Sequence, residues 1–336
     1  MKAMILAAGF GTRLFPLTID RTKPAIPFLG KPLVGYVAEY VAKFGFGEVV
    51  VNLHHQPDSV IKALGDGSRF GVKIHYTLEK PKILGTAGAL DNAREKLENE
   101  TFLIINGKII TDIDISKAIE THKQSGALAT MVLMENKNRE KFTIVETKGD
   151  LITGFGDFPK NSSQQPAVSS QQKGRQIRNP LMFTGIHILE PRVFEYIPRG
   201  VYSDIVPTFY RPAIAKGEKI VAHVTEGNWF ELSTIPRYLD ISLAMMNGRK
   251  NRVFSGERVQ ISGEATATDS VIWDDVLIDE GARINRTIIA DGVKIGRGEN
   301  YENAAIVRAD MLKNGEMPEK ALKGYFAGEN YVVPLD

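Results

Sequence analysis

The chain contains no cysteine, which excludes disulfide bonds and thiolate metal sites. It also lacks an excess of charge of either sign, because 42 Lys and Arg residues face 40 Asp and Glu residues, a net charge of +2. A balance this even gives no bulk electrostatic reason to bind nucleic acid or a membrane surface. We therefore expect neither nucleic acid nor membrane as a partner.

Long apolar runs are absent as well. No stretch approaches the roughly 20 apolar residues that a membrane span requires. The sequence opens on a short strand-like run, without the basic region, long apolar core and cleavage site of a signal peptide. The expected location is the cytoplasm. With 336 residues, 43% hydrophobic and 24% charged, the composition is that of a globular protein large enough for two domains.

The most informative stretch is an apolar run over residues 2–8 and the loop that follows it. The run is typical of a buried strand in a parallel sheet. Gly9 and Gly11 then let the backbone approach a ligand closely, and successive N–H groups in such a loop form a concavity that binds anions. Arg13 and Lys23 add positive charge. The loop thus predicts a site for nucleotide phosphates, although it matches neither the P-loop nor the dinucleotide fingerprint.

Segments with helical and strand periodicity alternate after this loop. Helical spacing covers residues 32–44 and 56–64, and strand patterns cover 48–53 and 72–77. Such alternation predicts a mostly parallel sheet with helices on both faces and an active site at the carboxyl ends of the strands. We expect an α/β domain over residues 1–248, a Rossmann-like three-layer fold with a mixed, mostly parallel sheet.

The pattern changes in residues 249–336, which we expect to form a second domain. Val253, Val259, Ala265 and Val271 lie six residues apart, and the spacing restarts at Val276 after a slip of one. A period of six with small or β-branched residues favours a parallel β-helix of hexapeptide turns over chance alternation in a β-rich tail. A short β-helix has an open end and apolar faces, so we expect a homo-oligomer that assembles through it.

The string Leu-Ala-Ala-Gly-x-Gly-Thr-Arg-Leu-x-Pro-Leu-Thr at residues 6–18, followed by Lys23-Pro24, resembles the signature of sugar-1-phosphate nucleotidyltransferases. Members of that family join a nucleoside triphosphate to a sugar 1-phosphate and release pyrophosphate, and many carry a left-handed β-helix. The resemblance implies catalytic phosphate contacts for Arg13 and Lys23. It implies nucleotide binding by Ala7, Ala8, Gly9, Gly11 and Thr12.

Residues 84–88, Leu-Gly-Thr-Ala-Gly, resemble the segment with which this family recognises the nucleobase. Taken alone, they also fit a glycine-rich helix start. The resemblance implies base contacts from Glu79, Gly85, Thr86 and Gly88. Because a carboxylate only accepts hydrogen bonds, Glu79 suits guanine, although related uridylyl enzymes also place Glu here. GTP with mannose 1-phosphate is the expected pair, with a uridylyl- or thymidylyltransferase acting on another sugar 1-phosphate as an alternative.

The element that starts at Asn106-Gly107-Lys108 resembles the family's metal-binding motif with one severe departure. Lys108 stands where the family has an Asp that binds Mg²⁺, and an ammonium group has no lone pair to offer a cation. Asp112 and Asp114 follow, and we expect Asp114 to cap the helix that begins after it rather than to bind metal. Lys108 is then expected to act in catalysis as a point charge.

A second motif, Trp229-Phe-Glu231, resembles the family's Trp-x-Asp, in which the Asp is the other Mg²⁺ ligand. Glu231 keeps the charge but moves the carboxylate by one methylene, so we expect Mg²⁺ binding to be weak or lost, with Glu231 as the remaining ligand. The resemblance assigns sugar binding to Asn106, Gly107, Gly185 and Trp229. His187, a lone histidine on a strand, is expected to be structural. The family's sugar-phosphate Lys is absent near Pro159, and residues 160–178 are expected to form a linker rather than a loop over the site.

Three functions compete. The favoured one is an active nucleotidyltransferase that tolerates Lys108. The second is a catalytically impaired homologue that binds nucleotide or nucleotide-sugar as a regulatory subunit. The third is an NAD(P)-dependent enzyme, which the failed dinucleotide fingerprint disfavours.

Overall fold

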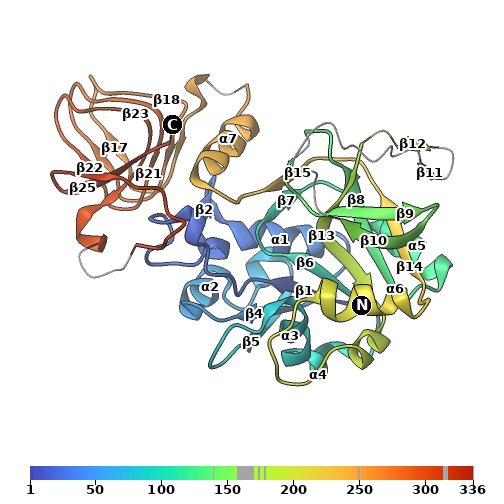
Figure 1. Ribbon diagram of the computed structural model, residues 1–336. Helices are drawn as coiled ribbons and strands as arrows, with labels where there is room; N and C mark the ends of the chain where they lie inside the picture. The colour runs from blue at the N-terminus through green and yellow to red at the C-terminus, as the bar shows by residue number, and fades with distance from the viewer. Residues whose placement is uncertain are drawn as a thin grey trace. The chain divides into compact units, whose positions relative to one another are not determined.

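The computed structural model describes residues 1–138, 140–156, 170–172, 175–177, 179–248, 250–312 and 317–335 (Figure 1). The chain divides into two compact units. Unit 1 comprises residues 1–8, 37–54 and 65–229, and unit 2 comprises residues 9–36, 55–64 and 230–336. In the described ranges, no helix combines the length and the apolar character needed to cross a membrane.

Unit 1 is built on a nine-stranded sheet with the order β5-β4-β1-β6-β13-β8-β14-β10-β9 (Figure 1). The strands are β1 Lys2–Leu6, β4 Glu48–Leu53, β5 Lys73–Leu78, β6 Phe102–Asn106, β8 Ala129–Glu135, β9 Ile144–Lys148, β10 Leu151–Gly156, β13 Leu181–Leu189 and β14 Ile220–Val224. Strands β5, β4, β1 and β6 run parallel, and β14 runs parallel to β8.

The remaining pairings of this sheet are antiparallel, so the expected mixed sheet is confirmed, and β13 and β10 run against the direction that the other seven strands share. Strand β13 runs antiparallel to both β6 and β8. Strands β9 and β10 form a hairpin with Gly149 and Asp150 between them, and Gly149 has φ 58°. A tight two-residue turn can only join antiparallel strands, and this hairpin extends the sheet beyond β14.

Strands β1, β4 and β6 of this sheet are buried over most of their length, which explains why they are nearly continuous apolar runs. On β1, Met4 packs in a cluster with Leu90 and Leu97, while Ala3 and Ile5, which alternate with it, are also fully buried.

The α-helices of the two units are α1 Leu33–Lys43, α2 Pro57–Leu64, α3 Gly85–Asn92, α4 Arg94–Leu97, α5 Ile115–Ser125, α6 Arg211–Ala215 and α7 Ile235–Met245.

The tail of unit 2 is a stack of short parallel strands. Phe254 pairs with Val271, and Val271 pairs with Ile288, an offset of 17 residues that the side-chain bonds also keep. On another side of the stack, Gln260 pairs with Leu277. The strands are β16 Phe254–Ser255, β17 Gln260–Ile261, β18 Thr266–Thr268, β19 Val271–Ile272, β20 Leu277–Ile278, β21 Arg283–Ile289, β22 Lys294–Ile295 and β23 Asn300–Arg308.

An offset of 17 residues is one short of three hexapeptides, which accounts for the slip in the six-residue spacing. The corners of the stack repeat with the same offset: Asp269, Arg286 and Asn303 all have positive φ, at 46°, 49° and 47°. The repeat ends beyond residue 312, where β25 Asn330–Pro334 pairs antiparallel with β23 and β24 Tyr325–Ala327 pairs antiparallel with β25.

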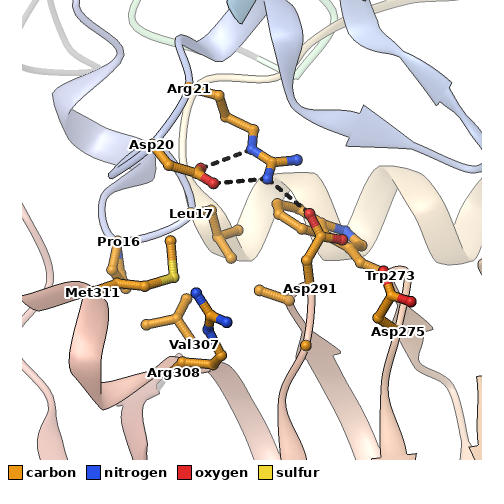
Figure 2. A pocket seen from close by; sticks show the side chains of 12 residues that line it. Pro16, Leu17, Asp20, Arg21, Trp273, Asp275, Asp291, Val307, Arg308 and Met311 are labelled. Carbon is orange, nitrogen blue, oxygen red and sulfur yellow. Dashed lines mark hydrogen bonds and ion pairs between the residues drawn. The ribbon is translucent and has the colours of Figure 1, made fainter.

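Residues 9–36 belong to the same unit as this tail. The Tyr238 hydroxyl donates to the Pro27 carbonyl at 2.7 Å. Arg21 forms ion pairs with Asp20 at 2.8 Å and with Asp291 at 2.7 Å, and its guanidinium lies 5.4 Å from the centre of the Trp273 ring. Figure 2 shows these groups around a cavity of about 330 Å³. The segment that continues the glycine loop is therefore anchored to the tail strands.

Candidate functional site

A chain of hydrogen bonds joins three strand ends at the carboxyl edge of the parallel strands. The Ala7 N–H donates to Oδ1 of Asn52 at 2.8 Å, and Nδ2 of Asn52 donates to Oε1 of Glu79 at 2.6 Å. The other oxygen of Glu79 accepts from the Leu84 N–H at 2.6 Å. The segment after β1 is thereby tied to the segment that leads into α3.

Sequence reasoning missed Asn52, although a signal was present. Asn52 is the polar residue that follows three consecutive valines in β4, and its side chain is only 3% exposed. Glu79 is 1% exposed and both of its oxygens have protein partners. In this structure Glu79 orients the loop before α3, and a direct contact of Glu79 with a base stays a prediction.

The glycines of the predicted base-recognition segment make room for protein backbone. A Cβ at Gly85, whose φ is 73°, would lie 2.6 Å from the Ser203 carbonyl oxygen, and a Cβ at Gly88 would lie 2.7 Å from that of Val201. The Ala87 and Gly88 N–H groups both donate to the Ser203 carbonyl, at 2.8 and 3.1 Å. These two N–H groups in the first turn of α3 therefore already have an acceptor within the protein.

Asp204 does not cap the helical segment that follows it. The segment after it forms a π-helical turn, Val206–Tyr210, and then α6, and the Asp204 side chain caps neither. Its Oδ1 instead accepts from the N–H and the hydroxyl of Thr86, at 3.3 and 3.4 Å. A carboxylate at the start of α3 is favoured by the dipole of a helix N-terminus.

Three residues with predicted nucleotide or sugar contacts line one cavity of unit 1. The cavity has a volume of about 270 Å³. It is lined by Leu6, Thr86, Leu90, Asn106, Phe183, Gly185, His187, Asp204, Ile205 and Val206. Thr86, Asn106 and Gly185 come from segments far apart in the sequence, and the sheet brings them together.

His187 is structural, as expected for a lone histidine on a strand. Its Nδ1 lies 2.5 Å from the Tyr210 hydroxyl, and its side chain is 3% exposed. Burial lowers the pKa of His187 to about 3, because removal from water disfavours the imidazolium. The imidazole is thus neutral near pH 7 and contributes no charge to the cavity.

Gly185 is required where Asn106 packs against β13. Its φ is 79°, and a Cβ there would lie 2.1 Å from Nδ2 of Asn106. The Trp229 indole N–H donates to the neighbouring Thr184 carbonyl at 2.8 Å. Asn106, Gly185 and Trp229, all predicted sugar contacts, therefore lie around one segment of β13.

Replacing Gly185 by Ala is expected to lower the free energy of unfolding by more than the roughly 1–2 kcal/mol of left-handed backbone strain, because Asn106 must also move. Gly126→Ala is the matched control, since Gly126 has φ 60° and a Cβ there meets no described atom within 4 Å. Urea denaturation of both variants measures the difference. Equal losses would show that Asn106 does not depend on Gly185.

Asp112 holds the segment before Trp229 in place through hydrogen bonds with Asn228. Its two oxygens accept from the N–H and the side-chain amide of Asn228, both at 2.6 Å, and the Thr111 hydroxyl donates to the Asn228 carbonyl at 2.7 Å. Asp114 accepts from the Ser116 N–H at 3.0 Å and caps α5, which confirms that expectation. Both carboxylates that follow Lys108 therefore have structural partners.

The two predicted metal-ligand positions carry an ammonium group, that of Lys108, and a carboxylate, that of Glu231. Lys108 is half-buried between β6 and β7 Ile109–Thr111, and its ammonium cannot ligate a cation. Glu231, in β15 Trp229–Glu231, is 9% exposed. In the parts of the chain that the structure covers, no group of three or more His, Asp or Glu residues is arranged to hold a metal ion. These donors do not fit an ordinary Mg²⁺ site.

The glycine loop of unit 2 is shaped by a close backbone approach. Gly11, at φ 70°, precedes the turn Thr12–Leu14, and a Cβ there would lie 2.9 Å from Cβ of Lys23. A Cβ at Gly9 would meet no described atom within 4 Å. Arg13 is exposed, whereas Lys23 is only 9% exposed. The loop thus places Gly11 against Lys23, the second of its two predicted phosphate contacts.

Two expectations lie outside the described residues. They are the absence of a sugar-phosphate Lys near Pro159 and the nature of most of the segment 160–178.

Gly107, a predicted sugar contact, lies against the end of β1: its N–H donates to the Leu6 carbonyl at 2.9 Å, and a Cβ there would lie 2.9 Å from the same oxygen. Gly107 therefore joins the end of β6 to the end of β1.

Comparison with known proteins places these residues in context. The sequence profile described as "Nucleotidyl transferase" matches residues 2–248. UTP–glucose-1-phosphate uridylyltransferase of Synechocystis sp. is 30% identical over 88% of this chain and 76% of the relative. Mannose-1-phosphate guanylyltransferase of Mycobacterium tuberculosis is 25% identical over 89% of this chain and 82% of the relative.

A solved structure supports the fold. A Bacillus anthracis chain described as a glucose-1-phosphate thymidylyltransferase superposes with a TM-score of 0.60 at 22% identity. The superposition covers 74% of this chain and 96% of the other. At this identity the likeness establishes the Rossmann-like α/β fold alone.

Proposed function

Because the chain belongs to the nucleotidyl transferase family, we propose that it transfers a nucleotidyl group from a nucleoside triphosphate to a sugar 1-phosphate. The products are a nucleotide-sugar and pyrophosphate. The observation that carries this proposal is the family match over residues 2–248, which contain every candidate site residue. Relatives named as uridylyl- and guanylyltransferases of sugar 1-phosphates support the same reaction.

The reaction needs positioning and charge neutralisation more than covalent catalysis. A phosphate oxygen of the sugar 1-phosphate attacks the α-phosphorus in line, a new P–O bond forms, and the bond to the leaving pyrophosphate breaks. Arg13 and Lys23 neutralise the triphosphate, and Lys108 supplies a further point charge. The hexose occupies the cavity of Asn106 and Gly185. The remaining residues of the glycine loop, of the α3 start and around Trp229 position the two substrates.

The first substrate pair to test is GTP with mannose 1-phosphate, since several relatives are named mannose-1-phosphate guanylyltransferases. UTP with glucose 1-phosphate is the second pair, supported by the relative that is 30% identical. Release of pyrophosphate is measured with every combination of GTP, UTP, dTTP and ATP with mannose, glucose and N-acetylglucosamine 1-phosphates, with and without Mg²⁺. No release above background in any combination would refute the proposed reaction.

We propose that Mg²⁺ assists this protein weakly or not at all at the Glu231 position. The support is chemical: Lys108 replaces the acidic residue that the family motif carries, and Asn228 occupies both oxygens of Asp112. Among the described residues, no group of three or more His, Asp or Glu side chains is arranged to hold a metal ion. The Mg²⁺ dependence of the turnover panel tests this point.

We also propose that the tail, residues 249–336, forms a short left-handed parallel β-helix that assembles subunits. The parallel pairing at a constant offset supports a coil. The tail also has an exposed edge: β24 ends its sheet, and on it Tyr325 and Phe326 are 53% and 64% exposed. Exposed aromatic side chains on an edge strand are suited to pairing with another chain.

The full-length protein is accordingly expected to sediment as an oligomer, and Phe326→Glu is expected to shift it toward the monomer. A charge on this exposed edge opposes association without removing buried core. Leu151→Glu is the control, because Leu151 is 45% exposed on β10 of unit 1. Analytical ultracentrifugation at micromolar concentration measures the oligomeric state of the full-length protein and of both variants. A monomeric full-length protein would rule out assembly through the tail.

A further inference from the structure

The cavity of unit 1 has an unusual charge for a protein that handles phosphates. Of the ten described residues that line it, Asp204 is the one charged near pH 7, because burial keeps His187 neutral with a pKa of about 3. The Thr86 hydroxyl and the Asn106 amide are the nearby uncharged polar groups. No Lys or Arg belongs to these ten residues. The lining therefore suits hydroxyl groups and not an anion.

The Asp204 carboxylate is held in a fixed position. Its Oδ1 accepts from the N–H and hydroxyl of Thr86 at 3.3 and 3.4 Å, and its Oδ2 accepts from the Tyr202 hydroxyl at 3.0 Å. Gly85 permits this approach, since a Cβ there would lie 3.1 Å from Oδ1. An ionised carboxylate has about four acceptor sites, so these three bonds leave capacity for a ligand hydroxyl.

We propose that Asp204 is a specificity-determining residue that selects an uncharged hexose and disfavours sugars that carry a carboxylate. This inference rests on the proposed function and names the substrate class of its sugar. A sugar hydroxyl can donate to the Asp204 carboxylate in a charge-assisted hydrogen bond. A carboxylate on the sugar would instead place two like charges in a partly desolvated cavity, where their repulsion is stronger than in water.

The cavity volume agrees with a single sugar ring. It is about 270 Å³, below the roughly 300–1,000 Å³ of sites for drug-sized ligands. Leu6, Leu90 and Phe183 supply apolar walls. Apolar walls with a few placed polar groups are the usual composition of a small-molecule site, and here the charged one is Asp204.

The test is calorimetric titration of the full-length protein and of Asp204→Asn with mannose, glucose and glucuronic acid 1-phosphates. Each titration is run with and without a non-hydrolysable GTP or UTP analogue. The unmodified protein is expected to bind the better neutral sugar at least about tenfold more tightly than glucuronic acid 1-phosphate. Asp204→Asn is expected to weaken binding of the neutral sugar 1-phosphate and to strengthen binding of the acidic one. The ratio of the two dissociation constants should change by at least about tenfold. Asn keeps an acceptor for Thr86, so the start of α3 is preserved.

Glu95→Gln is the matched control, because Glu95 is exposed on α4, does not line the cavity and loses the same charge. It should leave the ratio unchanged. An unchanged ratio in Asp204→Asn, or an equal loss for both sugar classes with a lowered melting temperature, would show a structural role and overturn the inference. If no sugar 1-phosphate binds the unmodified protein and no pair turns over, the proposed function itself fails, and this inference with it.

Discussion

Replacing Lys108 by Asp is expected to raise Mg²⁺-dependent release of pyrophosphate by at least about tenfold, which corresponds to roughly 1.4 kcal/mol of barrier. The substitution restores the carboxylate that the family motif carries at this position. A metal ion supplies divalent charge and orients the attacking and leaving groups together, which one ammonium cannot do. The gain can therefore reach the several kcal/mol that a bound metal contributes to such transition states.

The control for this change is Lys108→Ala, which removes the ammonium without adding a ligand. It should show a smaller Mg²⁺ response than Lys108→Asp if the carboxylate itself matters. Initial rates over a Mg²⁺ titration measure both variants. Should the unmodified protein be as fast as Lys108→Asp with the same Mg²⁺ requirement, our placement of the metal position would be wrong.

Loss of Arg13 or Lys23 is expected to weaken nucleoside triphosphate binding by about 1.5–3 kcal/mol, through the loss of a charge-assisted contact in a partly dry site. Of the two, Lys23→Ala should have the larger effect, because Lys23 is 9% exposed and Arg13 is exposed. An electrostatic contact is stronger where water is excluded. Calorimetric titration with GTP, UTP and dTTP gives the affinities.

Lys62→Ala provides the comparison, since Lys62 is exposed on α2 of the same unit and its loss removes the same charge. Its affinity for nucleotide should match that of the unmodified protein. If both Arg13→Ala and Lys23→Ala also match it, the glycine loop does not bind the triphosphate.

Local sequence patterns predicted most elements of unit 1. The strand Glu48–Leu53 has the bounds expected from its apolar run, and Asp114 caps α5 as its position suggested. Buried strands and N-caps depend on neighbours in the sequence, so a single sequence reveals them. The direction of β13 and of the β9–β10 hairpin within the sheet depends on distant pairings, so the sequence predicted a mixed sheet without showing which strands are reversed.

In the candidate site, too, local features could be predicted from the sequence and contacts between distant segments could not. The glycines were recognised as special, but the structure shows that Gly85 and Gly88 accommodate the backbone of residues 201–203, more than 110 positions away. Asn52 and Asp204 were missed as site residues because their partners, Ala7 and Thr86, are remote in the sequence. Such contacts carry no local periodicity. The segments that bear the chemistry were predictable, whereas the residues that hold them were not.

The constant offset in the tail also bears on how this protein can change its length. Arg258 lies over Asp275, and Arg252 over Asp269, each pair separated by 17 residues. Removing or duplicating one whole coil would bring each corner and each core residue to an equivalent position, whereas a shorter insertion would turn apolar side chains outward. The tail can therefore gain or lose whole coils. Duplication of one coil during evolution would lengthen it without requiring new side-chain packing.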